Sequence, residues 1–350
     1  MSTIKSNKPK IVVVCGQTGS GKTSLALNLC KKFNGEIVNA DSRQVYKFMN
    51  IGTAKDIDKI VGAEHVLPNK RAQYIAPLQN TIQGIPVHLV NIVSPNERYN
   101  VGQFKKDAEG AIADIIYRGK VPFVVGGTGL YIDALVENFS FQPISNLKSQ
   151  ISKPQLKTKK LENLVQLLGK VDPQALKMVD LKNKRRVERA LGYCLTTGKK
   201  FSDSRKKGKR KYDVLKIAPK INRETLHKKI DQRVEKMITE GLENEVKMLA
   251  KKYGWKSEAM TGIGYKEWRP LFANSKLQMT NYKQITNDKL QISNIQQVAD
   301  QIKLSTRQYA KRQMTWFKRD KEINLVNSVK EAEKLVKSFI SSHDPKAMGD

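Results

Sequence analysis

The stretch that decides the fold runs Ile11-Val12-Val13-Val14-Cys15-Gly16-Gln17-Thr18-Gly19-Ser20-Gly21-Lys22-Thr23. Its last eight residues match the phosphate-binding pattern G-x-x-x-x-G-K-[ST]. In this pattern the glycines let the backbone wrap around an anion, so that N–H groups and the start of the next helix face it. The apolar run before the glycines predicts a buried strand, and residues 25–33 after them predict a helix. The sequence therefore predicts a strand, a phosphate-binding loop and a helix in direct succession.

Two further segments repeat this layout. The apolar run at residues 36–40 leads into Asp41-Ser42. The run at residues 121–125 leads into Gly126-Gly127-Thr128-Gly129 and a helix over 130–137. Short β-branched runs that alternate with helices indicate an α/β fold with a P-loop NTPase-like parallel sheet and flanking helices. Further strands are predicted at 88–93 and 214–218. Because ligands of such folds bind where the strands end, we expect both glycine loops and Asp41 at one edge of the sheet.

The strand pattern is absent between residue 139 and about residue 210, where the sequence predicts helices at 160–169 and 183–195. After residue 223 the chain is again predicted as helical, with clear segments at 225–252 and 298–319, whereas 56–86 form a polar loop or small excursion. We therefore expect four parts: a P-loop α/β core (1–138), an all-helical insertion domain (139–204), the rest of the core with C-terminal helices (205–335) and a tail (336–350).

The charge of the chain indicates a polyanionic partner. It has 64 Lys and Arg against 33 Asp and Glu, a net charge of +31, and most of the excess lies after residue 140. Arg185, Arg186 and Arg189 have the helical spacing of phosphodiester contacts, although a solvated basic face has the same spacing. Residues 205–211 form a basic cluster, and residues 307–318 mix basic and aromatic side chains. In that mixed segment the aromatic residues are expected in the core and Arg307, Lys311, Arg312 and Lys318 toward RNA.

Composition also excludes several classes of protein. Three cysteines without paired spacing fit neither a disulfide framework nor a zinc site, and four scattered histidines argue against a histidine metal site. No apolar run reaches the roughly 18 residues that span a bilayer, and no secretory signal pattern opens the chain. We expect a cytoplasmic protein with no membrane partner.

Three residues carry the expected chemistry. Lys22 is predicted to place its ammonium on the outer phosphate, and the Thr23 hydroxyl is predicted to coordinate Mg²⁺. Asp41 has three interpretations: an acidic partner of Mg²⁺ in a nucleotide hydrolase or kinase, a general base toward an acceptor, or a cap of the next helix. The residue types alone leave all three open.

Several motifs follow one another in a recognisable order from residue 11 to about residue 320. They are Gly16 to Thr23, Asn39-Ala40-Asp41-Ser42-Arg43-Gln44-Val45-Tyr46, Ile51-Gly52-Thr53-Ala54-Lys55, Val125-Gly126-Gly127-Thr128-Gly129-Leu130-Tyr131, Arg186-Val187-Glu188-Arg189-Ala190-Leu191, Gly262-Ile263-Gly264-Tyr265-Lys266-Glu267 and Thr306 to Phe317. This combination resembles the tRNA dimethylallyltransferase (isopentenyl-tRNA transferase) family. The chain has no C-terminal cysteine and histidine set for a zinc finger, so it resembles the shorter, bacterial-type form.

The resemblance implies an activity and assigns residues to it. The implied reaction moves a dimethylallyl group from dimethylallyl diphosphate to the exocyclic amine of the adenine 3′ of the anticodon in tRNA, with Mg²⁺ as cofactor. The resemblance implies that the P-loop holds this diphosphate rather than ATP, through Gly16, Thr18, Gly19, Ser20, Gly21, Lys22 and Thr23. It implies catalytic roles for Asp41 as the base, for Thr23 on the metal, and for Arg223, which steadies the diphosphate. From the resemblance and the charge pattern together, the positions expected at the tRNA are Asp41, Ser42, Arg43, Gln44, Thr128, Arg185, Arg186, Arg189, Lys311 and Arg312. We expect a monomer.

Other functions remain as alternatives. A P-loop kinase of a small metabolite has little use for the basic surplus, and a prenyltransferase of free adenine nucleotides has no need of the helical insertion. A non-catalytic RNA-binding protein has no need of an intact Lys22, Thr23 and Asp41. Two departures from the family pattern are Gln17 and Gly19, which stand where proline and alanine are usual, and the length of the 56–86 segment.

Overall fold

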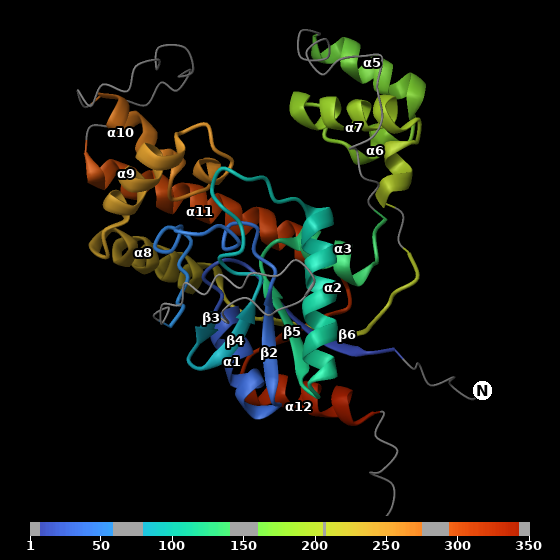
Figure 1. The fold of residues 1–350 in the computed structure, drawn as a ribbon, viewed down its shortest axis with the longest axis vertical. Coiled ribbons are helices and arrows are strands. Elements are labelled where there is room, and N and C mark those ends of the chain that lie inside the picture. Colours follow the sequence, from blue (N-terminus) through green and yellow to red (C-terminus); the bar gives the residue numbers. More distant parts are fainter. Residues whose placement is uncertain (1–7, 59–79, 141–159, 206–207, 275–293, 343–350) are drawn as a thin grey trace, which may run out of the picture. The chain divides into compact units, whose positions relative to one another are not determined.

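The computed structural model describes residues 8–58, 80–140, 160–205, 208–274 and 294–342. The chain divides into two compact units, one formed by residues 1–132 with 212–350 and one by residues 133–211 (Figure 1). The smaller unit is wider than the expected insertion of 139–204, because the end of one helix before it and the return segment after it belong to it.

The larger unit is built on a seven-stranded sheet in the order β3-β4-β2-β5-β1-β6-β7. The strands are β1 (Lys10–Cys15), β2 (Gly35–Asn39), β3 (Asn80–Ile82), β4 (Ile85–His88), β5 (Val121–Gly126), β6 (Asp213–Pro219) and β7 (Ile323–Val326). β3 pairs antiparallel with β4, and every other pairing is parallel. In the central register Val13 lies opposite Val124 of β5 and Lys216 of β6. The predicted α/β fold is confirmed, and the sheet predicted as parallel is parallel except for the β3–β4 pair.

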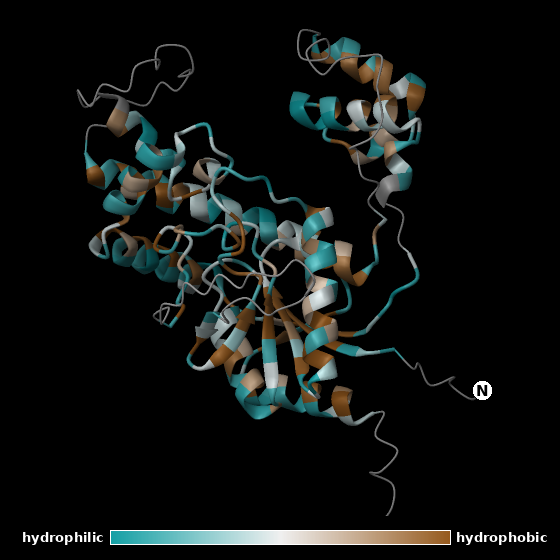
Figure 2. Ribbon diagram, viewed as in Figure 1, coloured by the Kyte–Doolittle hydropathy of each residue, from teal (hydrophilic) through white to brown (hydrophobic). Residues whose placement is uncertain are grey.

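Helices cover the sheet because alternate strand residues point to opposite faces. Val12, Val14 and Phe123 pack in one cluster with α1 (Lys22–Lys32) and α12 (Val329–Ser341). α2 (Val101–Tyr117) contacts β2 and β5 with buried residues that lie outside this cluster, and α3 (Gly129–Val136) follows β5. Apolar residues, brown in Figure 2, are concentrated in the central strands, whereas the surrounding helices carry both colours. In the part of the chain that the structure describes, no helix is long and apolar enough to cross a membrane.

The C-terminal helices form a second core in the same unit. They are α8 (Arg223–Thr239), α9 (Leu242–Tyr253), η2 (Ala259–Thr261), η3 (Lys266–Trp268), α10 (Arg269–Asn274) and α11 (Ile295–Phe317). Tyr265 and Trp268 are fully buried there, and Tyr46 and Met49 from the segment after β2 join them. This core therefore fixes the segment that follows Asp41.

Four expectations about elements are wrong. The strand predicted at 88–93 ends at His88, because Leu89 (φ 62°) and Asn91 (φ 56°) turn the backbone into the left-handed region. The helix predicted at 225–252 is two helices, since Gly241 between them has φ 92°. β7 interrupts the region predicted as helical, and α12 continues to Ser341, so the tail does not begin at residue 336. Of the 56–86 segment, residues 59–79 lie outside the described residues.

The smaller unit is helical. It contains α5 (Leu161–Val171), α6 (Ala175–Met178), α7 (Lys184–Thr197) and η1 (Phe201–Arg205). Leu164, Leu168 and Leu191 form its core. The carboxylate of the fully buried Asp172 accepts hydrogen bonds from the N–H and the hydroxyl of Ser202, at 2.7 and 2.9 Å, which closes the unit on itself.

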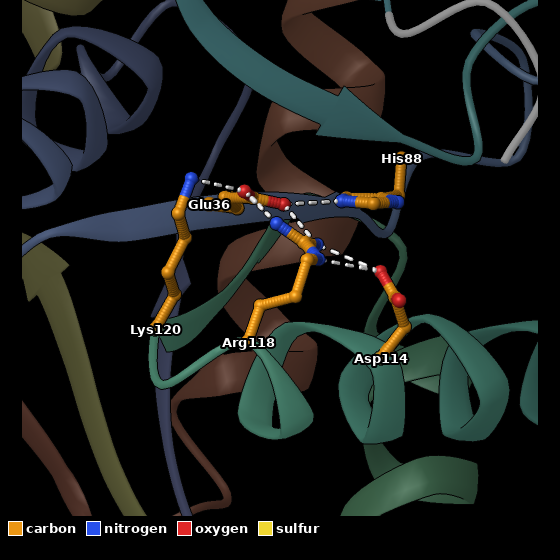
Figure 3. A network of polar contacts seen from close by, with 5 residues as sticks. All are labelled: Glu36, His88, Asp114, Arg118 and Lys120. Carbon is orange, nitrogen blue, oxygen red and sulfur yellow. Dashed lines mark hydrogen bonds and ion pairs between the residues drawn. The ribbon is translucent and has the colours of Figure 1, made fainter.

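A buried carboxylate joins several elements near the beginning of β2. Glu36 is fully buried and accepts hydrogen bonds from Arg118, from Lys120 at 2.7 Å and from His88 at 2.8 Å (Figure 3). Arg118 also binds Asp114 of α2 at 2.7 Å. Burial raises the pKa of Glu36, but these hydrogen bonds outweigh it and hold the pKa at about 2. The network ties α2, β2 and β4 at the end of the strand away from Asp41.

Candidate active site

The phosphate-binding loop is shaped to receive an anion. Gly19 (φ 79°) and Gly21 (φ 87°) have the left-handed backbone that glycine adopts without strain. α1 begins at Lys22, and no side chain caps its first N–H groups, which leaves them for a ligand. The Ser20 hydroxyl is buried and has no hydrogen-bond partner among the described residues. A buried hydroxyl of this kind needs a partner, and an oxygen of a bound ligand meets that need.

A cavity of about 570 Å³ opens beside this loop. Its lining includes five polar residues, called the polar wall below: Thr18, Lys22 and Thr23 of the loop and Arg233 and Lys236 of α8. Asp41 and Lys55, which follow β2, line the same cavity. Six apolar residues, called the apolar wall below, also line the cavity: Ile37, Ile57, Ile82, Val87, Val90 and Val125. The lining further includes polar side chains, among them Asn39, Gln44, Asn50 and Gln232. All of these described lining residues belong to the larger unit.

Two cations in the polar wall are partly withdrawn from water. Burial lowers the pKa of Lys22 to about 8, although the Asp41 carboxylate opposes this effect. Burial also lowers the pKa of Arg233, whose guanidinium donates hydrogen bonds to the Thr18 hydroxyl and the Thr53 carbonyl, each at 3.1 Å. Among the described residues neither cation forms an ion pair with a carboxylate. Because unpaired, desolvated cations are unfavourable, the cavity is complementary to an anion.

The second glycine loop lies directly against Asp41. The N–H of Thr128 binds the Ala40 carbonyl at 3.2 Å, and the N–H of Ser42 binds the Thr128 hydroxyl at 3.1 Å. A Cβ atom at Gly126 would come within 2.2 Å of the Ala40 oxygen, so only glycine fits there. Asp41 accepts the N–H of Arg43 at 2.8 Å, and its side chain lines the cavity. The structure brings the two glycine loops and Asp41 together at one edge of the sheet, as expected.

A glutamine of α11 joins the two loops. The Gln313 side chain is buried; its oxygen accepts the N–H of Thr18 at 2.9 Å and its nitrogen donates to the Gly127 carbonyl at 2.8 Å. Gln17 donates in turn to the Ala310 carbonyl at 2.9 Å. α11 therefore supports the floor of the site, a role that the mixed basic and aromatic pattern of 307–318 did not indicate.

Three residues predicted to bind the diphosphate or the tRNA, namely Arg223, Arg43 and Gln44, either lie outside the cavity or bind other parts of the chain. Arg223, the first residue of α8, is exposed and does not line the cavity. Arg43 donates to the Glu258 carbonyl at 3.0 Å and to the Thr261 hydroxyl at 3.2 Å. Gln44 donates to the Thr53 carbonyl at 3.1 Å. Arg43 and Gln44 thus bind neighbouring segments of their own chain.

The other basic residues expected at RNA are exposed, with two exceptions. Arg185, Arg186 and Arg189 are exposed on α7 of the smaller unit, and Lys311, Arg312 and Lys318 are exposed in or after α11. Arg307 pairs with Asp231 of α8, and Arg210 of the basic cluster pairs with Glu137, so these two guanidinium groups serve internal contacts. Residues 206–207 of the cluster lie outside the described residues.

Sequence reasoning missed two groups of the site. Arg233 is one basic residue in a helix that is rich in them, and Gln313 is one polar residue in a helix with many. Neither has a local pattern that separates it from its neighbours. Only the packing of α8 and α11 against the loop identifies them.

The donors near the loop suit Mg²⁺ rather than a metal held by the protein alone. Within the described ranges no group of three or more His, Cys, Asp or Glu side chains forms a metal site. The Thr23 hydroxyl lines the cavity, and the buried Ser20 hydroxyl of the same loop has no hydrogen-bond partner among the described residues. Magnesium takes few protein oxygens and completes its shell with water and substrate phosphates, so this sparse oxygen set fits it.

A parallel α/β sheet with a glycine-rich loop, desolvated cations and an acid at the ends of its strands defines a class of enzyme that acts on a phosphorylated substrate. Comparison with known proteins places the chain more narrowly. A family model described as IPP transferase matches residues 75–320. A tRNA dimethylallyltransferase of Staphylococcus haemolyticus is 38% identical over 320 residues, which cover 89% of this chain and 85% of that protein.

Solved structures agree with this placement. The crystal structure of a tRNA isopentenylpyrophosphate transferase from Staphylococcus epidermidis is 33% identical with a TM-score of 0.60, and the match covers 96% of this chain and all of that chain. A eukaryotic dimethylallyltransferase, described as acting on tRNA, is 28% identical with a TM-score of 0.74, and the match covers 97% of this chain and 81% of that one. The chain belongs to the IPP transferase family of tRNA dimethylallyltransferases, and the resemblance seen in its motifs is confirmed.

Proposed function

We propose that this protein transfers a dimethylallyl group from dimethylallyl diphosphate to the exocyclic amine of the adenine 3′ of the anticodon in tRNA. Family membership supports the transfer to tRNA. The single observation that carries the residue assignment is the cavity, in which an anion-binding wall, Asp41 and an apolar wall face one space.

The polar wall holds the diphosphate. Lys22, Arg233 and the loop N–H groups place positive charge where negative charge grows as the leaving group departs, which stabilises the transition state. Thr18, Ser20 and Thr23 add hydroxyl groups, and Thr23 would hold Mg²⁺ together with diphosphate oxygens. When bound, Mg²⁺ supplies further positive charge to the leaving group. Arg223 begins the helix whose Leu226 packs on Gly19, so its exposed side chain stays a candidate for the same diphosphate.

The apolar wall favours a prenyl diphosphate over a nucleotide. Ile37, Val87 and Val90 bury a five-carbon hydrocarbon chain favourably, which a prenyl donor has and a nucleotide lacks. This is the reason to prefer a prenyl donor to the ATP of a metabolite kinase.

The reaction needs a good leaving group and a base. The adenine amine is a weak nucleophile because its lone pair is delocalised into the ring. As its nitrogen bonds to the allylic carbon, the bond from that carbon to the diphosphate oxygen breaks, and the diphosphate keeps the electron pair. Asp41 accepts the proton that the amine loses. The adenine reaches the cavity only after it leaves its stack, which costs a few kcal/mol.

The basic residues outside the cavity hold the tRNA in this proposal. Arg185, Arg186 and Arg189 on the helical unit contact the anticodon stem, and Lys311 and Arg312 contact its phosphates from α11. Ser42, Arg43, Gln44 and Thr128, which surround Asp41, contact the extruded nucleotide and its neighbours.

The test is incubation with dimethylallyl diphosphate, Mg²⁺ and unmodified tRNA, followed by mass analysis of the nucleosides. The proposal expects one adenosine per tRNA to gain the mass of a C5H8 group, at the position 3′ of the anticodon. No modified adenosine, combined with turnover of ATP on a small metabolite, would support the kinase alternative instead.

A further inference from the structure

The buried carboxylate of Glu245 fixes the backbone of residues 50–52, which lie between Asp41 and Lys55 in the chain; this set of hydrogen bonds is called the clamp below. Glu245 of α9 accepts the N–H groups of Asn50 and Ile51, each at 2.9 Å, and of Gly52 at 3.1 Å. The Tyr265 hydroxyl donates to the same carboxylate at 2.7 Å. Three successive N–H groups on one carboxylate make a rigid attachment, because each bond to a charged acceptor is stronger than a neutral one.

The clamp leaves little freedom in the segment. A Cβ atom at Gly52 would come within 2.5 Å of the Tyr265 ring, so the backbone packs directly on that ring. The next residue, Thr53, accepts hydrogen bonds from Arg233 and Gln44 through its carbonyl. The segment therefore enters the cavity in a fixed position, and it ends there with Lys55.

Lys55 is a desolvated cation held by two neutral acceptors. Its ammonium donates to the Asn91 side-chain oxygen at 2.6 Å and to the Tyr46 carbonyl. Burial lowers the pKa of Lys55 to about 7, while the carboxylates of Glu245 and Asp41 raise it. An ammonium has three N–H groups, so two partners leave one for the cavity that Lys55 lines.

The charged groups that act on Lys55 differ from those that act on Lys22. From other elements, the charged groups that share its cavity or its clamp are Glu245 of α9, Asp41 after β2, Lys22 of α1, Arg233 and Lys236 of α8, and Glu240 directly after α8. Asp56 lines the cavity from its own segment. Of these, Glu245 and Asp41 act on Lys55, whereas Asp41 and Arg233 act on Lys22. Asp41 is thus the one carboxylate that interacts with both lysines.

We propose that Lys55 is a positioning residue whose ammonium balances the charge of the Asp41 carboxylate while a diphosphate fills the cavity. This inference rests on the proposed function. A diphosphate beside a carboxylate repels it, and an ammonium fixed in the same cavity offsets that repulsion. Asp41 then stays available to accept the amine proton, and Lys55 keeps its own proton throughout.

This role predicts how the rate of prenyl transfer depends on pH. The role of Lys55 requires the ammonium, so the rate falls as pH rises and the side chain loses its proton. Arginine keeps its charge at every working pH, so Lys55→Arg moves this alkaline fall to higher pH. Lys55→Met removes the charge but keeps much of the length, and it lowers kcat at pH 7 by roughly tenfold or more, with KM for the donor within about threefold.

The experiment is a single-turnover rate profile from pH 6 to pH 9 with saturating tRNA and donor, for the wild type, Lys55→Arg, Lys55→Met and the control Lys47→Met. Lys47 is an exposed lysine of the same segment, and its variant is expected to match the wild type. A purely structural role for Lys55 would lower the thermal midpoint but leave the profile of the arginine variant parallel to that of the wild type.

Three outcomes decide the matter. A shifted alkaline limb in Lys55→Arg supports the inference, also when the methionine variant does not fold. A limb that coincides with the wild-type limb, or a methionine variant with full kcat, overturns it while the proposed function stands. A wild-type protein that forms no prenylated adenosine overturns both.

Discussion

At the scale of single residues, the site depends on groups whose surroundings differ sharply from water. Among the described residues, Lys22 and Arg233 lose hydration without gaining a carboxylate partner, and the Ser20 hydroxyl has no hydrogen-bond partner. Such arrangements lower the stability of the free protein, and the lost free energy is regained when a ligand binds. For this reason they mark functional sites. Asp41 stands beside them with one oxygen bound to a backbone N–H of its own turn.

The role of Asp41 is open to a direct test. Asp41→Asn keeps the shape and the hydrogen bond to Arg43 but cannot accept the proton of the amine. The rate of prenyl transfer should fall about 100- to 10,000-fold, and the dissociation constant for tRNA should stay within about threefold. Single-turnover kinetics and a filter-binding titration measure the two quantities. Glu97→Gln, an exposed acid outside the cavity, is the control. A variant that retains the wild-type rate would remove Asp41 as the base.

At the scale of elements, helices far along the chain complete a site that begins at the first strand. α8 packs its Leu226 and Ile230 against Gly19, and α11 sends Gln313 between the two glycine loops. The loop conformation is therefore not a property of the glycine motif alone. It depends on contacts with residues almost three hundred positions away.

This dependence predicts the effect of a single change on α11. Gln313→Leu leaves the Thr18 N–H and the Gly127 carbonyl without their partner in a buried place. The free energy of unfolding should fall by about 2–3 kcal/mol, and KM for dimethylallyl diphosphate should rise because the loop loses its support. Urea unfolding and donor titration provide the measurements. Gln308→Leu changes an exposed glutamine of the same helix and should shift stability by less than about 0.5 kcal/mol. Equal stability of the two variants would contradict the bridging role.

The basic face of α7 makes a second prediction at this scale. Replacement of Arg185, Arg186 and Arg189 by glutamine should weaken tRNA binding and reduce the slope of log affinity against log salt by roughly 2 to 3, if each arginine contacts one phosphate. A triple glutamine variant at Lys330, Lys334 and Lys337 removes the same charge from α12 and should leave the slope nearly unchanged. Two variants with the same slope would show that α7 makes no specific phosphate contacts.

At the scale of the whole molecule, the cavity and the stabilising Glu36 network lie toward opposite ends of β2. The ends of the strands carry the cavity, while the Glu36 network fastens α2, β2 and β4 near the opposite end of β2 (Figure 3). A carboxylate that is buried and fully hydrogen-bonded stabilises the fold only while it is ionised.

The pH dependence of stability follows from that carboxylate. Its pKa is about 2 in the folded protein against an ordinary value of 4.5, so its contribution is fully present above pH 4.5 and is lost as pH falls toward 2. The contribution is at most about 3 kcal/mol. Urea unfolding at pH 5 and pH 3 should show a loss in the wild type that is clearly smaller in Glu36→Gln. An identical loss in both proteins would mean that other groups govern the acid response.

The parts of this protein that can be predicted from sequence are those that a short range of residues encodes. The period of apolar residues predicts β1, β2, β5 and β6, and the spacing of Gly16 to Thr23 predicts the loop, because backbone conformation there depends on immediate neighbours. The strand predicted at 88–93 is wrong although the segment is apolar. Leu89 and Asn91 take left-handed conformations, and the apolar pattern does not encode them.

The sequence by itself determined the fold class, the position of the glycine-rich loop between β1 and α1, the basic character of the second half and, through its motifs, the family. Only the tertiary structure decided that Arg233 rather than Arg223 lines the cavity, that Gln313 bridges the loops and that Glu245 fixes the segment leading to Lys55. The physical reason is that a motif specifies local backbone geometry, whereas the hydration and charge of a side chain are set by whichever distant elements pack around it.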